Sequence, residues 1–110
     1  MKSISKELIG ASAAPLILSI LRSGDSYGYE IVQRVKEQTG GKVSWNEASI
    51  YPVLKKLENS GMIKSYWKVN DTERPRKYYT LLTDGKIQLE HNKQEWELIH
   101  SVFQNLWNPA

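Results

Sequence analysis

The segment from Asn46 to Ile63 most constrains what this chain can fold into. Its apolar residues Ile50, Leu54 and Leu57 recur at helical spacing. Gly61 then supplies the left-handed position that commonly ends a helix. The other face carries hydroxyls, an amide and two lysines: Ser49, Tyr51, Pro52, Lys55, Lys56 and Asn59. Such a face suits either plain solvent exposure or contact with phosphates and base edges in a DNA major groove.

Two short strands are predicted directly after this helix. Met62–Val69 and Lys77–Leu82 are rich in β-branched and aromatic residues, and the polar segment 70–76 between them has the composition of a turn. The far side of this turn holds three cations within four residues, Arg74, Arg76 and Lys77. A helix followed by a hairpin with a cationic tip is the order of a winged helix-turn-helix, whose helix enters the major groove while the hairpin reaches the neighbouring backbone.

Three motifs, in this order, resemble the PadR family of transcriptional regulators. They are Tyr27-Gly28-Tyr29-Glu30-Ile31, Ile50-Tyr51-Pro52-Val53-Leu54-Lys55-Lys56-Leu57-Glu58 with Gly61, and Arg74-Pro75-Arg76-Lys77-Tyr78-Tyr79 with Leu81 and Gly85. The resemblance spans Leu16 to Gly85. It implies a homodimeric, sequence-specific DNA-binding repressor whose C-terminal helix makes the dimer. The chain departs from the family pattern at Glu73, where glycine is usual, and at Leu82, which separates Leu81 from Thr83.

No motif for enzyme chemistry stands out in the 110 residues. The chain has no cysteine, so it has neither disulfides nor thiolate ligands. It also has no glycine-rich phosphate loop and no metal-ligand cluster. His91 and His100 are separated by nine positions on one predicted helix, so they point to different faces. We therefore expect a protein that is not an enzyme and that needs neither a cofactor nor a metal.

Length, charge and hydropathy narrow the remaining classes. A chain of 110 residues favours a single domain. The net charge of +3 is compatible with a nucleic-acid partner without requiring one. The N-terminus does not resemble a signal peptide, and no run approaches the ~18 consecutive apolar residues of a membrane span. We expect a cytoplasmic protein that does not act at a membrane.

The N-terminal half predicts two further helices, at Ser5–Arg22 and Tyr27–Gln38. Pro15 lies inside the first of them. That segment is therefore either one helix kinked at Pro15, which we favour, or a shorter helix that begins there. Ser26 or Asp25 is expected to cap the second helix, because a side-chain oxygen at that position accepts from the free backbone N–H groups.

The start of the third helix has two solutions. Ser44-Trp45-Asn46-Glu47 fits a capping box but places Pro52 in the helix interior. A turn at Asn46 that leads into a helix from Ser49 keeps Pro52 in the first turn, where no donor is required, and we favour this second arrangement. Val43, just upstream, is expected to pair with the hairpin as a short third strand.

The last predicted helix, Thr83–Trp107, is longer than a small domain needs for its own core. Residues spaced alternately by three and four form a seam along it: Leu89, Asn92, Trp96, Ile99, Phe103 and Leu106. The apolar members (Leu89, Trp96, Ile99, Phe103, Leu106) are the predicted dimer interface, and Asn92 would set the register. The predicted fold is mainly α with a small β-hairpin: a winged helix-turn-helix at 1–82 and a dimerisation helix at 83–110, forming one compact unit.

The expected DNA contacts divide between the third helix and the hairpin. The helix would contribute Ser49, Tyr51, Pro52 and Lys55, and the hairpin Arg74, Arg76 and Lys77. Tyr27, in the first turn of the second helix, suits either a phosphate contact or a core position with a solvent-facing hydroxyl. The expected partners are a palindromic double-stranded operator and a second copy of the chain. The alternative is a winged-helix module for protein contacts, which has no need for a cationic hairpin edge.

Trp96 lies near the expected dimer axis and has two interpretations. The indole either fills the interface or faces its own copy, so that two indoles hold a planar aromatic ligand that releases the operator. The ligand site would then comprise Leu8, Ala11, Leu18, Asn92 and Trp96. In this respect the chain resembles the multidrug-sensing members of the family more than the phenolic-acid sensors. A regulator without a small-molecule inducer is the alternative.

Overall fold

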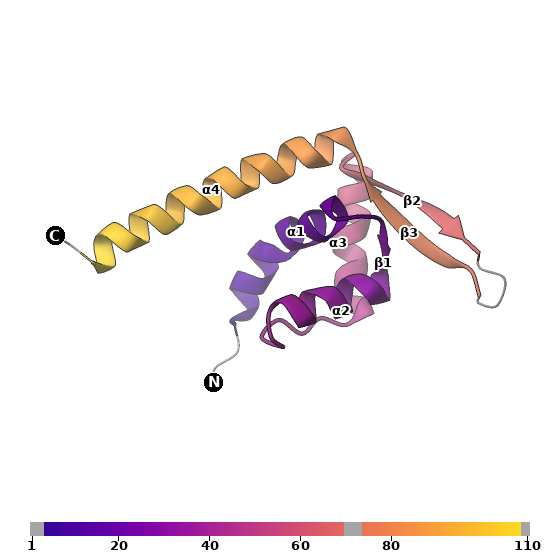
Figure 1. Cartoon of the computed structure of the whole chain (residues 1–110), viewed down its shortest axis with the longest axis horizontal. Coiled ribbons are helices and arrows are strands. Elements are labelled where there is room, and N and C mark those ends of the chain that lie inside the picture. Colours follow the sequence, from indigo (N-terminus) through magenta and orange to yellow (C-terminus); the bar gives the residue numbers. More distant parts are fainter. Residues whose placement is uncertain (1–3, 70–73, 109–110) are drawn as a thin grey trace.

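A computed structural model describes residues 4–69 and 74–108, and in this part of the chain helices pack around a small antiparallel sheet (Figure 1). The elements in chain order are α1 (Lys6–Arg22), β1 (Ser26–Tyr27), α2 (Gly28–Gln38), α3 (Glu47–Asn59), β2 (Ile63–Lys68), β3 (Arg76–Leu81) and α4 (Thr83–Trp107). The hairpin β2–β3 projects from one end of the molecule, and α4 runs away toward the other. The prediction of a mainly helical winged helix-turn-helix with a hairpin is confirmed. Glu73 lies outside the described residues.

Helix α3 begins earlier than we predicted. Asn46 is the N-cap, and its side-chain oxygen accepts a hydrogen bond from the backbone N–H of Ser49 at 2.8 Å. The predicted start at Ser49 is therefore wrong, and so is a capping box led by Ser44. Pro52 consequently lies inside the helix, where its missing N–H cannot donate to the carbonyl one turn earlier. The end of α3 is as predicted: Gly61 has φ 76°.

Helix α1 continues through its proline. Ser5 is the N-cap and accepts from the N–H of Leu8 at 3.3 Å, and the helix runs without interruption to Arg22. A single helix across Pro15 is thus confirmed, and the kink at Pro15 stays a prediction. The Ser19 hydroxyl donates to the carbonyl of Pro15 at 2.7 Å, a local side-chain bond of the kind that often bends a helix.

The third strand is β1, not Val43 as predicted. Ser26 and Tyr27 pair antiparallel with Tyr79 and Tyr78 of β3, giving the sheet order β1-β3-β2. Val43 is buried in the core instead. The pairing also explains why the predicted cap of α2 is wrong: Tyr27 occupies the N-cap position without a side-chain bond, while the buried Ser26 hydroxyl donates to Glu30 at 2.5 Å.

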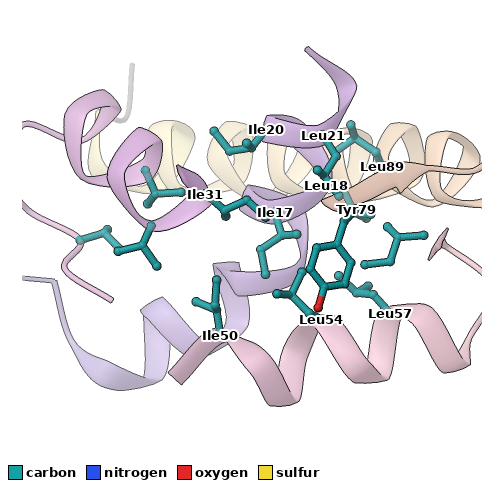
Figure 2. Close-up of a cluster of buried hydrophobic side chains, with 14 residues drawn as sticks. Ile17, Leu18, Ile20, Leu21, Ile31, Ile50, Leu54, Leu57, Tyr79 and Leu89 are labelled. Atoms are coloured by element: carbon teal, nitrogen blue, oxygen red, sulfur yellow. The ribbon is translucent and has the colours of Figure 1, made fainter. Parts of the chain in front are cut away.

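The core lies where α1, α2 and α3 meet the sheet and the start of α4. Figure 2 shows the Tyr79 ring reaching from the sheet toward Leu54 and Leu57 of α3. The core consists of Ile17, Leu18, Ile20, Leu21, Ile31, Val32, Val35, Val43, Ile50, Leu54, Leu57, Ile63, Tyr79 and Leu89. Because β3 and α3 share this core, the hairpin and α3 hold a fixed relation to each other.

The first turn of α4 is locked against the junction between α3 and β2. The N–H of Leu82 donates to the carbonyl of Met62 at 3.0 Å. Gly85 passes so close to this carbonyl that an added Cβ would lie 2.2 Å from the oxygen. Glycine is therefore required at this position by the close approach of two backbones.

Candidate nucleic-acid interface

A groove separates the exposed face of α3 from the hairpin. It consists of two adjoining depressions, of about 260 Å³ and about 360 Å³, which share Tyr51 and Lys77. The first is lined by Tyr27, Gly28, Tyr29, Glu47, Tyr51, Trp67, Arg74, Pro75, Arg76 and Lys77. The second is lined by Tyr51, Lys55, Glu58, Asn59, Lys77 and Tyr79. We call this the α3–hairpin groove; it brings four cationic side chains together with two carboxylates.

Most of the predicted DNA-contact residues meet in this groove. Tyr27, Tyr51, Lys55 and all three hairpin cations line it. Two residues of α3 do not. Ser49 borders a depression toward α1, and its hydroxyl donates to the capping oxygen of Asn46 at 3.0 Å. Pro52 borders a different depression between α1, α3 and α4.

Aromatic rings fix the cationic edge of β3. The Arg76 guanidinium carbon lies 4.5 Å from the ring centroid of Tyr27, and the Tyr27 ring meets that of Tyr78 edge-on at 5.2 Å. A cation held over a ring face is attracted by the ring quadrupole. Tyr27 is half-buried and therefore positions Arg76, a role that neither of our two interpretations contained.

Two hydrogen-bonded clamps set the angle of the hairpin. Glu58 of α3 accepts from the backbone N–H of Ser65 at 3.2 Å and from its hydroxyl at 2.6 Å. On the other face, the Tyr66 hydroxyl donates to Asp25 at 2.6 Å. This bond lowers the pKa of Asp25 and raises the pKa of Tyr66, because it favours the carboxylate and the protonated phenol.

Tyr51 connects α3 to the start of α2. A Cβ added at Gly28 would be 3.6 Å from the Tyr51 hydroxyl oxygen, so the first turn of α2 lies directly against this ring. The same hydroxyl donates to Glu47 at 3.4 Å. Burial and, after it, the Glu47 carboxylate raise the pKa of Tyr51. The phenol therefore stays protonated at neutral pH, and its one proton is directed to Glu47.

The α3–hairpin groove also contains exposed aromatic residues that the sequence analysis missed, Tyr29 and Trp67. The strand period would have found the second of them. Trp67 is two residues after Ser65, so both point to the face of β2 that meets α3.

Comparison with known proteins decides the family. The model of the Transcriptional regulator PadR-like family matches residues 17–91. The chain belongs to this family. Its members are transcriptional regulators, so this PadR-like protein is a regulator and not an enzyme.

Two relatives set the scale of the similarity. The negative transcriptional regulator PadR of Bacillus subtilis is 37% identical over 84 residues, which cover 76% of this chain and 44% of that protein. A transcriptional regulator from Clostridium thermocellum is 34% identical, with a TM-score of 0.84 over 93% of this chain and 96% of that one. The structure of B. subtilis PadR in complex with operator DNA has a TM-score of 0.63 over 71% of this chain and 44% of that one. The chain thus spans less than half of the B. subtilis protein.

Helix α4 of this PadR-like chain exposes most of its predicted seam. Trp96 is 39% exposed, and Ile99, Phe103 and Leu106 are also exposed. The assignment of Leu89 to the dimer interface is wrong. Leu89 is only 5% exposed, because it packs into the core of its own chain and has no face left for a partner. Three more exposed apolar residues of α4 were not predicted: Leu98 and Val102, one turn apart on another face, and Trp107, which stacks on Phe103 at 4.9 Å.

The predicted ligand residues are only partly brought together in one chain. Leu18 is fully buried in the core, yet it also lines the depression that Asn92 lines. Asn92 lines a depression of about 450 Å³ between α1, α3 and α4, but Trp96 does not. Leu8 and Ala11 are exposed on α1.

Other site chemistry is scarce over residues 4–69 and 74–108. No group of His, Asp and Glu side chains there could hold a metal ion. The exposed His91 approaches Glu95 at 3.6 Å, one turn along α4. No helix in the same ranges is long and apolar enough to cross a membrane.

Proposed function

We propose that this chain is a sequence-specific transcriptional repressor that binds operator DNA through the α3–hairpin groove. One observation carries the proposal: Lys55, Arg74, Arg76 and Lys77 converge on the groove beside the exposed face of α3. A strip of cations next to an amphipathic helix is the electrostatic footprint of a duplex. The solved complex of the B. subtilis relative with operator DNA supports this assignment.

The two sides of the groove would do different work. Helix α3 enters the major groove, where Lys55 in the α3–hairpin groove, and Ser49 outside it, meet base edges and give sequence preference. The hairpin cations Arg76 and Lys77 meet phosphates, which gives affinity for any sequence. The ring of Tyr27 beneath Arg76 limits the conformations of that guanidinium and so reduces the entropy lost on binding.

Salt dependence tests this division directly. Arg76→Ala should weaken binding to every duplex and reduce the slope of log affinity against log salt by about 0.9, the value for one phosphate contact. Lys55→Ala should instead relax the preference at one or two base pairs of sites selected from random DNA. A protein-interaction module would show no steep loss of DNA affinity with salt, and that result would refute DNA binding.

We further propose a homodimer that pairs through α4 beyond Leu89. Seven exposed apolar residues lie in this part of α4, and large exposed apolar patches mark association sites. They are Trp96, Leu98, Ile99, Val102, Phe103, Leu106 and Trp107. Two reading heads related by a two-fold axis would recognise a palindrome with half-sites about 10 bp apart, or a multiple of that. Light scattering should return a dimer at micromolar concentration, and a monomer would refute this proposal.

The proposed inducer is a planar aromatic molecule held between the Trp96 rings of two chains. Trp96 is partly exposed on α4, and a flat cation between two indoles would gain roughly 0.5–2 kcal/mol of cation–π attraction. Leu8, Ala11, Leu18 and Asn92 are its candidate neighbours, and Leu18 and Asn92 line one depression between α1, α3 and α4. Protein carrying Trp45→Phe, Trp67→Phe and Trp107→Phe keeps Trp96 as its single indole, so a flat dye should quench it saturably and release DNA. A Trp96→Ala protein that binds the dye but has lost its dimer would assign Trp96 to the interface alone.

A further inference from the structure

Trp67 is an exposed indole that does not belong to the hydrophobic core formed by the described residues. The side chain is 67% exposed near the outer end of β2. A large apolar ring left in water costs free energy that packing against the core would recover. Its position therefore suggests a partner that covers it.

The indole faces the α3–hairpin groove. Ser65, two residues earlier on β2, bonds to Glu58 of α3, so the strand alternation turns Trp67 toward α3 as well. Its cross-strand neighbour is Lys77 of β3, and both residues line the first depression together with Tyr51. Trp67 thus forms the hairpin side of the groove, opposite the exposed face of α3.

The lining of the groove indicates what that partner is. Arg74, Arg76 and Lys77 line the same depression as the indole and make it positively charged, while the Glu47 carboxylate in that lining already accepts from Tyr51. A partner in this place must carry negative charge and also offer an apolar face of about the width of one ring. A sugar–phosphate strand has both features, because each deoxyribose lies between two phosphates.

We propose that Trp67 clamps one DNA strand between the hairpin and α3. The indole packs on a deoxyribose, and its ring N–H donates to an adjacent phosphate oxygen. This inference rests on the proposed DNA binding and adds a contact without charge. Removal of the indole should therefore lower the affinity for DNA and leave the salt dependence of that affinity unchanged. Removal of a cationic side chain cannot give this pattern.

The first test measures affinity for a mixed-sequence duplex of roughly three helical turns over a series of salt concentrations. Trp67→Ala should bind about tenfold more weakly at every salt concentration, with an unchanged slope. Trp67→Phe keeps the packing and loses the donor, so it should recover part of the affinity. Arg76→Ala is the matched control, because it removes a charge from the same depression and should flatten the slope.

The second test does not depend on the folding of an alanine variant. Protein with Trp45→Phe, Trp96→Phe and Trp107→Phe keeps only the indole of Trp67, and its fluorescence should change on addition of the duplex. Protein that instead keeps only Trp107, an indole of almost equal exposure (66%) at the end of α4, should show no change.

Each outcome has a definite meaning. Suppose that the DNA affinity of wild type falls steeply with salt, that Trp67→Ala binds equally well, and that the Trp67 fluorescence stays constant. This result overturns the clamp and leaves the proposed function intact. Wild-type protein without salt-dependent binding overturns both. A Trp67→Ala protein that loses affinity only for its preferred sites assigns the indole to base reading and also overturns the backbone clamp.

Discussion

Replacement of Gly85 by alanine tests whether α4 is locked to the reading head. The new Cβ would lie 2.2 Å from the Met62 carbonyl oxygen and 2.6 Å from Cδ1 of Leu81. A side-chain carbon does not approach closer than about 3.0 Å, so the two backbones must separate by roughly 0.8 Å. That separation would also weaken the bond from the N–H of Leu82 to the same carbonyl, which is 3.0 Å long.

The expected magnitude follows from three effects. Overpacking of this size costs about 1–3 kcal/mol, and the weakened hydrogen bond adds about 0.5–1.5 kcal/mol. Alanine regains about 1 kcal/mol as the better helix former. We therefore expect Gly85→Ala to lower the free energy of unfolding by about 0.5–3.5 kcal/mol, where each kcal/mol corresponds to about 4–8 °C in Tm for a chain of this size.

Urea unfolding followed by circular dichroism, at one fixed protomer concentration, measures this change. Gly10→Ala is the matched control. Gly10 lies within α1, and nothing is within 4 Å of a Cβ added there. The substitution should therefore stabilise the protein by about 0.5–1 kcal/mol. If Gly85→Ala also proved stabilising, the junction would yield to the new methyl group and the lock would not exist.

Three further predictions concern the hairpin and its supports. The Tyr66 hydroxyl lowers the folded-state pKa of Asp25, so this bond stabilises the protein above the unfolded pKa of about 4, and the stabilisation is lost as pH falls below it. The free energy of unfolding by which wild type exceeds Tyr66→Phe in urea should therefore shrink between pH 6 and pH 3. A difference that stays constant over this range would contradict the linkage. Glu58→Ala leaves the Ser65 N–H and hydroxyl without their acceptor, so amide exchange at Ser65 should accelerate, whereas unchanged protection would show that core packing alone holds β2. Gly61→Ala places a side chain at φ 76°, so it should cost about 1 kcal/mol or more in the same urea assay, and a neutral result would mean that the turn relaxes.

Regular periodicity made most of the fold predictable from the sequence. The bounds Thr83–Trp107 predicted for the last helix are those of α4, because a long apolar repeat with an acidic first turn leaves little ambiguity. The end of α3 was equally clear, since Gly61 provides a backbone conformation that other residues avoid. Both signals are local and survive in any tertiary context.

The missed elements depend on contacts that no local pattern encodes. Strand β1 has two residues, too few to show a period, and it exists only because β3 lies beside it. The start of α3 depends on which side chain reaches the first turn of the helix, and that side chain is Asn46.

The same limit applies to the candidate site. Periodicity placed Leu89 on the apolar seam of α4 but could not show which surface covers it. The core of its own chain covers it. The groove position of Trp67 became apparent only when the contact between Ser65 and Glu58 showed which face of the hairpin meets α3.

The contact of Gly85 with Met62 turns α4 into a lever arm. At about 1.5 Å per residue, its 25 residues extend roughly 37 Å from that fulcrum. In the proposed dimer, a tilt of only about 3° at the fulcrum would displace the far end by roughly 2 Å. The converse also holds: a 2 Å shift where two chains meet would turn each reading head by only a few degrees. Operator release would then rest on small rotations of rigid bodies, without any helix having to melt.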